Sequence, residues 1–331
     1  MPIAIGPWMP ETSPHELQTM LGDLHEKHRG NVTGNVATYI PELSKVNPDE
    51  FGVCVATANG QMFEAGDCDR LFTIQSISKP FTYALAMDEF GAAKVHEHVG
   101  VEPSGDAFNS IELHGLTNRP FNPMINTGAI TVTALLHARH GAGTFDHVLE
   151  RFSTIAGRTL TVDEDVYESE RRTGHRNRAI AHLLLNFGVV HDEAEAALDV
   201  YFRQCAIQVN SRDLAMMGAT LANMGCHPIT GRSAFSISYV KDILSIMFTC
   251  GMYDYSGQWA YRVGVPAKSG VAGGVMAVVN RQLGIGTYSP RLDRFGNSVR
   301  GTEVCIDLAS RLGLHVFDCV NVGSSFLDAI L

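Results

Sequence analysis

The chain has 331 residues, of which 45% are hydrophobic and 18% charged, the balance of a folded globular protein with a substantial core. Its formal net charge of -10 argues against nucleic acid or an anionic membrane as the main partner, because both need clustered Lys and Arg. The short basic clusters, at Arg171-Arg172 and at Arg176 and Arg178, are interpreted as parts of a solvated charged face.

The chain is predicted to begin with a helix and a hairpin. Ser13 is a suitable N-cap, Glu16 completes a capping box with it, and Gly30 ends the helix. Residues 51–65 are then rich in strand formers around Asn59-Gly60, a strong signal for a tight turn between two antiparallel strands.

A long helical middle follows the hairpin. Ser76, Lys79 and Met87 fall on neighbouring turns of one helix. Helical patterns then dominate from about residue 126 to residue 251. The clearest of them cover residues 179–187, residues 193–205 and a segment that Ser211 opens.

Strand character returns after the helical middle, at residues 259–265, 275–279 and 283–288. Thr302 is predicted to cap a last helix over residues 303–312. This order predicts an α+β fold, with an antiparallel sheet that is built from both chain ends and flanked by helices. We expect one domain over residues 1–331, with a sheet lobe (about 30–75 plus 256–331) and an inserted helical lobe (about 76–255).

The sequence Ser76-Ile77-Ser78-Lys79 is an S-x-x-K motif at the start of a helix. Positions i and i+3 share a helix face, so Ser76 Oγ and Lys79 Nζ can approach each other. Lysine can take the serine proton when burial or a nearby cation lowers its pKa from about 10.4. A second S-x-x-K, Ser238 to Lys241, lies in an ordinary amphipathic stretch and is interpreted as structural.

The triplet Lys268-Ser269-Gly270 is the second motif, inside a run of small residues from 266 to 274. On its own it would indicate only a glycine-rich strand edge. In serine β-lactamases and penicillin-binding proteins, however, a Lys-Ser/Thr-Gly triplet on a strand accompanies S-x-x-K. The two motifs in this order predict a serine β-lactamase/transpeptidase-like fold.

Several longer strings, spread from about Thr38 to Leu312, resemble the glutaminase family. They are Tyr39-Ile40-Pro41, Gln75 to Lys79, Phe121 to Asn126, Glu168-Ser169-Glu170, Arg176 to Ala179, Tyr201 to Cys205, Cys250 to Asp254 and Lys268 to Gly274. The resemblance implies hydrolysis of L-glutamine to L-glutamate and ammonia, without a cofactor. Departures from the family pattern are mild: Ala206 stands where serine is expected, and Pro80 where an aliphatic residue is usual.

The resemblance also implies a role for each site residue. Ser76 would be the nucleophile, Lys79 its general base, and Tyr253 the proton donor or relay for the leaving ammonia. Tyr39 would help to close the pocket, and the backbone N–H groups of Ser76 and Val271 would form the oxyanion hole. The amino-acid end of glutamine would be held by Asn126, Glu170, Asn177 and Tyr201. These groups suit an ammonium and a carboxylate, although without the resemblance each Asn and Tyr would more often be structural.

Three alternatives stay open. A penicillin-interacting acylase or β-lactamase would share Ser76, Lys79 and Lys268, but would have no evident use for Glu170. A non-catalytic scaffold protein would be expected to lose such reactive residues first. Asparagine differs from glutamine by one methylene, worth only about 1–3 kcal/mol in a pocket, so the resemblance alone selects glutamine.

The remaining features concern compartment, metals and assembly. Seven cysteines, an odd number without a C-x-x-C pair, favour reduced thiols. The N-terminus lacks the features of a signal peptide, and we expect a cytoplasmic protein without a membrane span. His96 with His98, and His137 with His140, have metal-like spacings, but the neighbouring sequence supplies no further ligands and no metal is predicted. A homodimer or homotetramer is expected from the resemblance.

Overall fold

The computed structural model describes residues 13–104, 111, 113–190 and 194–318. Cys319 and the N-terminal segment on which the signal-peptide prediction rests lie outside these residues. The six cysteines within them are free thiols. Among the described helices, none combines the length and apolar character needed to span a membrane.

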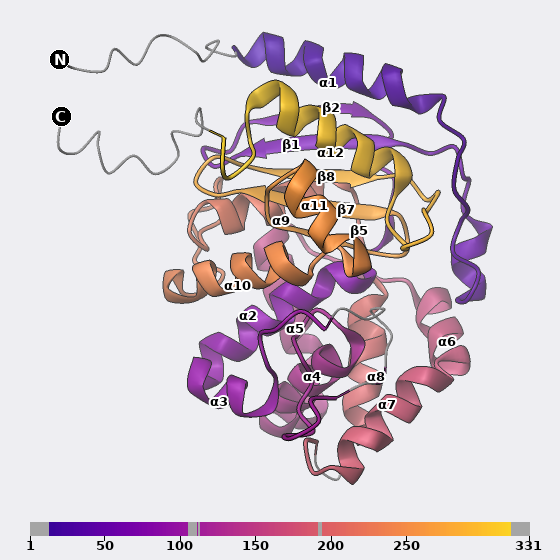
Figure 1. Ribbon diagram of the computed structural model, residues 1–331, viewed down its shortest axis with the longest axis vertical. Coiled ribbons are helices and arrows are strands. Elements are labelled where there is room, and N and C mark those ends of the chain that lie inside the picture. Colours follow the sequence, from indigo (N-terminus) through magenta and orange to yellow (C-terminus); the bar gives the residue numbers. More distant parts are fainter. Residues whose placement is uncertain (1–12, 105–110, 112, 191–193, 319–331) are drawn as a thin grey trace, which may run out of the picture.

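A five-stranded antiparallel sheet forms the upper part of the molecule in Figure 1. Its strand order is β2-β1-β8-β7-β6, so strands from the start of the chain pair with strands from its end. The strands are β1 (Gly52–Thr57), β2 (Met62–Gly66), β6 (Ala267–Ser269), β7 (Gly274–Val279) and β8 (Leu283–Tyr288). The prediction of one antiparallel sheet built from both chain ends is confirmed.

Helices cover the sheet and fill the space below it (Figure 1). They are α1 (Pro14–Arg29), α2 (Lys79–Phe90), α3 (Ala92–His98), α4 (Asn126–His140), α5 (Thr144–Ala156), α6 (Glu164–Thr173), α7 (His175–Asn186), α8 (Ala194–Cys205), α9 (Ser211–Ala222), α10 (Ile237–Cys250), α11 (Ser256–Arg262) and α12 (Val299–Leu312). The short 3₁₀ helices are η1 (Pro41–Lys45), η2 (Gln75–Ser78), η3 (Gly141–Gly143) and η4 (Tyr253–Tyr255). A small sheet in the order β3-β5-β4 consists of β3 (Phe72–Thr73), β4 (Thr161–Val162) and β5 (Ile207–Val209).

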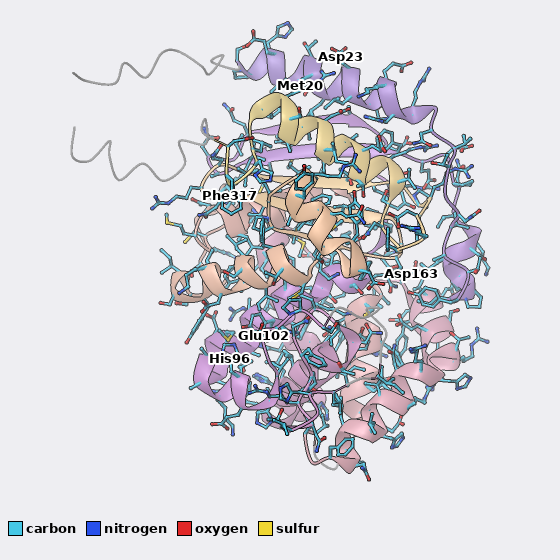
Figure 2. All side chains as sticks on the ribbon, viewed as in Figure 1. Met20, Asp23, His96, Glu102, Asp163 and Phe317 are labelled. Atoms are coloured by element: carbon cyan, nitrogen blue, oxygen red, sulfur yellow. The ribbon has the colours of Figure 1, made fainter. Side chains whose placement is uncertain are left out.

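The helix α1 packs on the sheet with its apolar side inward. Leu21 and Leu24 are fully buried in the core that α1 shares with α11, α12 and the sheet. Asp23 points away from this core into solvent (Figure 2). Ser13 and Glu16 form the predicted capping box.

The opposite face of the sheet is covered by α9, which lies directly against β8. The sequence of β8 alternates, with Leu283 and Ile285 in the core beneath α1 and α12. Gly284 and Gly286 face α9, and a Cβ on either residue would lie 2.2 Å from a backbone atom of that helix. Glycine is therefore required at both positions for this close approach. The lobe boundaries drawn from the sequence stay a prediction, and α9, placed there in the helical lobe, lies on the sheet.

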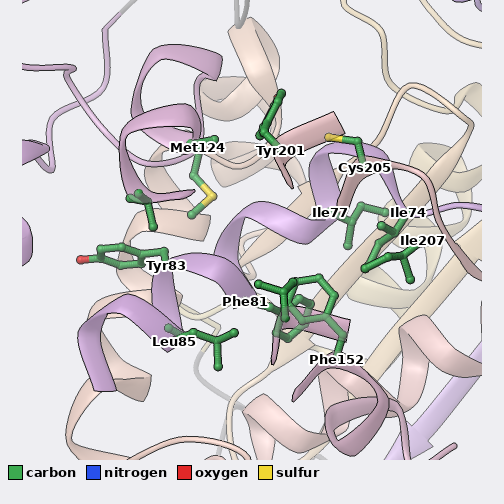
Figure 3. Close-up of a cluster of buried hydrophobic side chains, with 14 of the residues drawn as sticks. Ile74, Ile77, Phe81, Tyr83, Leu85, Met124, Phe152, Tyr201, Cys205 and Ile207 are labelled. Carbon is green, nitrogen blue, oxygen red and sulfur yellow. The ribbon is translucent and has the colours of Figure 1, made fainter. Parts of the chain in front are cut away.

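The helix α2 runs through the centre of the helical region and is buried on all sides from Lys79 to Met87. Figure 3 shows its apolar residues among those of neighbouring elements. Phe81 meets Phe152 of α5 edge to face, with ring centroids 5.8 Å apart. A helix that is buried on all sides belongs in a core, so the surrounding elements enclose its first turn together with Lys79.

Two predicted elements are wrong. Residues 259–265 were expected as a strand, but Ser256–Arg262 form α11, in which Trp259 is fully buried and its indole N–H donates to Val265 O. The last helix begins at Val299 rather than near Thr302, because Ser298 is its N-cap and accepts a hydrogen bond from Gly301 N.

Candidate active site

Ser76 lies in η2, a single 3₁₀ turn that leads into α2, rather than in the α-helix itself. Gln75, immediately before it, has a φ of 49°, and Tyr253 has a φ of 56°. Residues other than glycine rarely adopt this left-handed conformation, and it persists where the surrounding structure enforces it, often at functional sites. Two strained backbone positions from distant parts of the sequence therefore belong to the surroundings of Ser76.

Lys79 is fully buried one turn after Ser76. Its Nζ donates to Asn126 Oδ1 at 2.6 Å and to Met124 O at 3.2 Å. Within the described part of the chain these oxygens, and not Ser76 Oγ, accept its hydrogen bonds. Burial lowers the pKa of Lys79 to about 8, so the neutral amine that a general base requires is readily reached.

The hydroxyl that interacts with Ser76 belongs to Tyr253, and this interaction acts to lower the pKa of Tyr253 against the effect of burial. Tyr253 Oη also donates to Ser269 O at 2.9 Å. Lys268 Nζ donates to the same carbonyl at 2.8 Å and to Gly251 O at 3.0 Å, and it lies 4.2 Å from the centroid of the Tyr253 ring. Burial raises the pKa of Tyr253 and lowers that of Lys268 well below its usual value. A contiguous polar chain therefore runs from Ser76 to Lys268.

A cavity of about 260 Å³ opens beside Ser76. Six of the predicted site residues line it: Tyr39, Ser76, Asn126, Glu170, Asn177 and Tyr201. Lys79 and Tyr253 lie behind this lining. Val271 is also buried and follows β6, which packs against η2.

Asn126 connects the lysine to the cavity wall. Its Oδ1 accepts from Lys79 and, at 3.3 Å, from Tyr201 Oη. Its Nδ2 donates to Asn177 Oδ1 at 2.9 Å. Side chains from α2, α4, α7 and α8 are thus tied into one network, which orients amides and a hydroxyl toward the cavity.

Glu170 is the acidic group of the cavity. It is 6% exposed, and its Oε2 has no hydrogen-bond partner among the described residues. Burial raises the pKa of Glu170 to about 8, although Lys79 and Gln75 act in the opposite direction. A buried carboxylate oxygen without a donor is costly, so the site is suited to a ligand that brings a positive charge.

The structure adds three residues to the predicted site, of which Lys268 was noted in the sequence only as part of a motif and without a role. Gln75 and Cys205 line the cavity, and Lys268 supports Tyr253 from behind. Cys205 lies one helical turn after Tyr201, a spacing that could have revealed it. The second S-x-x-K copy lies on α10 with both Ser238 and Lys241 exposed, as its structural interpretation requires.

Comparison with known proteins gives consistent matches. A family model described as Glutaminase matches residues 34–317. A glutaminase of Trichormus variabilis is 54% identical over 94% of this chain and 93% of its own length. A glutaminase of Corynebacterium glutamicum is 46% identical over 96% of this chain and 76% of its own length.

Solved structures agree with these matches. Mglu in its glutamate form is 44% identical, with a TM-score of 0.88 over 92% of this chain and 71% of that chain. A probable glutaminase from Bacillus subtilis, complexed with 6-diazo-5-oxo-L-norleucine, is 36% identical, with a TM-score of 0.84 over 93% and 98% of the two chains. The β-lactamase-like α+β fold expected from the two motifs is thereby confirmed. The family model covers most of the chain, including every residue placed around the cavity, and the first relative is 54% identical over 94% of it. The chain therefore belongs to the glutaminase family.

Proposed function

We propose that this chain is a glutaminase that hydrolyses L-glutamine to L-glutamate and ammonia through a glutamyl ester on Ser76. The observation that carries the proposal is the Oε2 of buried Glu170, which has no hydrogen-bond partner in the described part of the chain and lies in the cavity that also contains Ser76. A substrate that has an ammonium at one end and an amide at the other satisfies both groups. The names of the relatives support this substrate, and the glutamate form of Mglu supports a site for the product.

In the proposed complex, Glu170 accepts hydrogen bonds from the substrate ammonium. Asn126, Asn177 and Tyr201 hold the α-carboxylate and orient the side chain. Tyr39 is 57% exposed and closes over the bound amino acid. The proposed assembly is a homodimer or homotetramer, as the family resemblance implies.

Acylation starts when Ser76 Oγ attacks the side-chain amide carbon of glutamine. Asn126 is both an acceptor of Lys79 and a proposed substrate ligand, so substrate binding allows Lys79 Nζ to turn toward Ser76 and take its proton. The backbone N–H groups of Ser76 and Val271 stabilise the oxyanion of the tetrahedral intermediate.

Collapse of this intermediate breaks the C–N bond. The proton that Lys79 holds passes through Tyr253 to the departing nitrogen, which leaves as ammonia. Lys268 keeps the Tyr253 hydroxyl directed at this path. Water then attacks the ester with the same groups as base and acid, which releases L-glutamate and restores Ser76.

The test is ammonia release from L-glutamine, L-asparagine and a chromogenic β-lactam by the wild type and by Ser76→Ala. We expect turnover of glutamine, lost in Ser76→Ala without loss of the folded structure. Ser238→Ala, in the exposed second S-x-x-K copy, is the matched control and keeps full activity. Turnover of the β-lactam alone would contradict the proposal, as would full activity of Ser76→Ala.

A further inference from the structure

A second cluster of polar side chains lies at the far end of α2. Glu89 there meets His140, at the end of α4, and His147 of α5. Its Oε2 lies 2.7 Å from His140 Nε2, and its Oε1 lies 2.7 Å from His147 Nε2. The two imidazole rings stack, with centroids 4.3 Å apart. Three ligand-type atoms from three helices therefore converge within 4.8 Å of one another.

We propose that Glu89, His140 and His147 bind a divalent transition-metal ion, with Zn²⁺ as the physiological ligand. Two imidazole nitrogens and one carboxylate oxygen form a ligand set that zinc accepts, with water at a fourth, open position. Mg²⁺ and Ca²⁺ prefer oxygen ligands alone, so two histidines select against them. The side chains are 13%, 27% and 25% exposed, which gives an ion access from solvent.

The sequence interpretation of His140, which predicted no metal, considered only neighbours along the chain. It paired His140 with His137 and found no carboxylate nearby, but His137 Nδ1 faces the Thr144 hydroxyl at 3.3 Å instead. Glu89 reaches His140 only because α2 and α4 pack side by side. The third ligand, His147, lies beyond the turn η3, which returns the chain so that α5 packs against α4.

The proton and charge arrangement is compatible with metal binding. The metal-bound form places each imidazole proton on Nδ1 and directs Nε2 toward the ion. Arg139 is the neighbouring cation, with its Nε 3.6 Å from Glu89 Oε2. Its closer contact, at 2.8 Å, is from Nη1 to the backbone carbonyl of Glu89, and its guanidinium stacks on Phe90. The carboxylate thus keeps its capacity to bind the ion.

The cluster is separate from the active site. Glu89 follows Lys79 by about 15 Å along the axis of α2. An ion there joins the ends of three helices that pack together, and binding to the folded state alone raises its stability by mass action. The proposal therefore predicts a stabilising metal rather than a catalytic one.

The test is titration of the full chain with Co²⁺ and Zn²⁺, for the wild type, His147→Gln and His182→Gln. His182 contacts Glu195 at 2.8 Å on the protein surface and serves as a matched His–Glu pair, to which no other described histidine contributes. We expect one Co²⁺ per chain, with the visible d–d bands of a nitrogen–oxygen site, and a Zn²⁺-dependent rise in Tm. His147→Gln should weaken affinity at least about tenfold and lose the rise in Tm, whereas His182→Gln should behave as the wild type.

Two results would overturn the proposal. Equal affinity of all three proteins would place the ion elsewhere. A sulfur-to-cobalt charge-transfer band would assign binding to the group Cys54, Glu64 and Cys68 instead. Circular dichroism and glutaminase activity of metal-free His147→Gln verify its fold, and His140→Gln repeats the test if that variant does not fold.

Discussion

Lys79 and Glu170 are buried close enough to interact, and burial moves their pKa values toward each other, to about 8 for both. The lysine has to be neutral to act as a base, and the carboxylate has to be ionised to bind an ammonium. Both groups reach the required state as the pH rises through the same range. The chemistry of the site thus depends on a pair of residues that sequence spacing alone would treat as independent.

The first prediction is a pH dependence. Below about pH 8 Lys79 is protonated and Glu170 is neutral in the free enzyme, so kcat/KM should rise with pH and level off above this value. In Glu170→Gln only the lysine of this pair remains to titrate, so the rise should become less steep. Initial rates of ammonia release between about pH 6 and pH 10 measure this. A profile that is flat below pH 8 would contradict it.

The second prediction concerns substrate binding. Glu170→Gln removes a charged hydrogen-bond partner of the ammonium, a loss of about 2 kcal/mol or roughly 30-fold. We expect it to appear mainly as a higher KM for glutamine, with a smaller effect on kcat. Glu168→Gln, whose exposed side chain pairs with Arg171, is the control and keeps both constants. A fall in kcat at unchanged KM would remove Glu170 from the ammonium site.

The site residues were predicted from sequence to different extents. Ser76 and Lys79 are three positions apart, so their proximity follows from local geometry. The roles of Gln75 and Lys268 were not predicted, although Lys268 was part of a motif, because they depend on tertiary contacts: a strained turn for Gln75 and a position against the Tyr253 ring for Lys268. Spacing along the sequence carries no information about such contacts.

At the scale of elements, the packing of α9 on β8 gives the third prediction. Gly286→Ala would bring a Cβ within 2.2 Å of Ser211 O and 2.5 Å of Ala215 N, both backbone atoms. We expect the free energy of unfolding to fall by about 3 kcal/mol, the upper end of the usual range for overpacking, because both contacts are with backbone atoms. Urea denaturation monitored by circular dichroism measures the change.

A matched glycine is available in α1. A Cβ at Gly22 would have no neighbouring atom within 4 Å. Gly22→Ala should therefore stabilise the protein by about 0.5–1 kcal/mol, because alanine lowers the entropy of the unfolded chain. Equal unfolding midpoints for Gly286→Ala and the wild type would show that α9 does not rest on β8.

Elements whose sequence signal lies in a few neighbouring residues were predicted correctly. The segments discussed below, whose structure depends on packing against distant residues, were not. The capping box at Ser13 and the Asn59-Gly60 hairpin are set by residues within a few positions of each other. The segment around Trp259 carries strand-forming residues, yet it is helical because the indole is buried beside the sheet. The last helix was predicted to start near Thr302, but it begins at Val299, and a Cβ at Gly301 in its first turn would lie 2.4 Å from the Thr287 hydroxyl.

At the scale of the whole molecule, the site is assembled from segments of both halves of the chain. The fourth prediction is that L-glutamate raises the Tm of wild type and Ser76→Ala in one cooperative transition. At 100 times its Kd the product should add about 2.7 kcal/mol. Glutarate, which lacks the ammonium, should add much less because it leaves Glu170 unpaired. Equal shifts with both ligands would contradict the proposed binding mode.

The overall fold could be predicted because the two motifs and the order of the elements indicated the same α+β architecture. The hairpin near the start and the strands near the end indicated one sheet, and S-x-x-K with Lys268-Ser269-Gly270 indicated its family of folds. The three-stranded sheet β3-β5-β4 was missed, because strands of two or three residues are too short to show a period-two pattern.

The position of β8 at the centre of the large sheet has a consequence for biosynthesis. Of the described strands β8 is the last to leave the ribosome, although β1 and β7 both pair with it. Until β7 and β8 emerge, a nascent chain therefore exposes one edge of β1 and the apolar side of α9. These surfaces are of the kind that chaperones bind. During that period β6, which carries Lys268, is not joined to β1, because β6 reaches β1 only through β7 and β8.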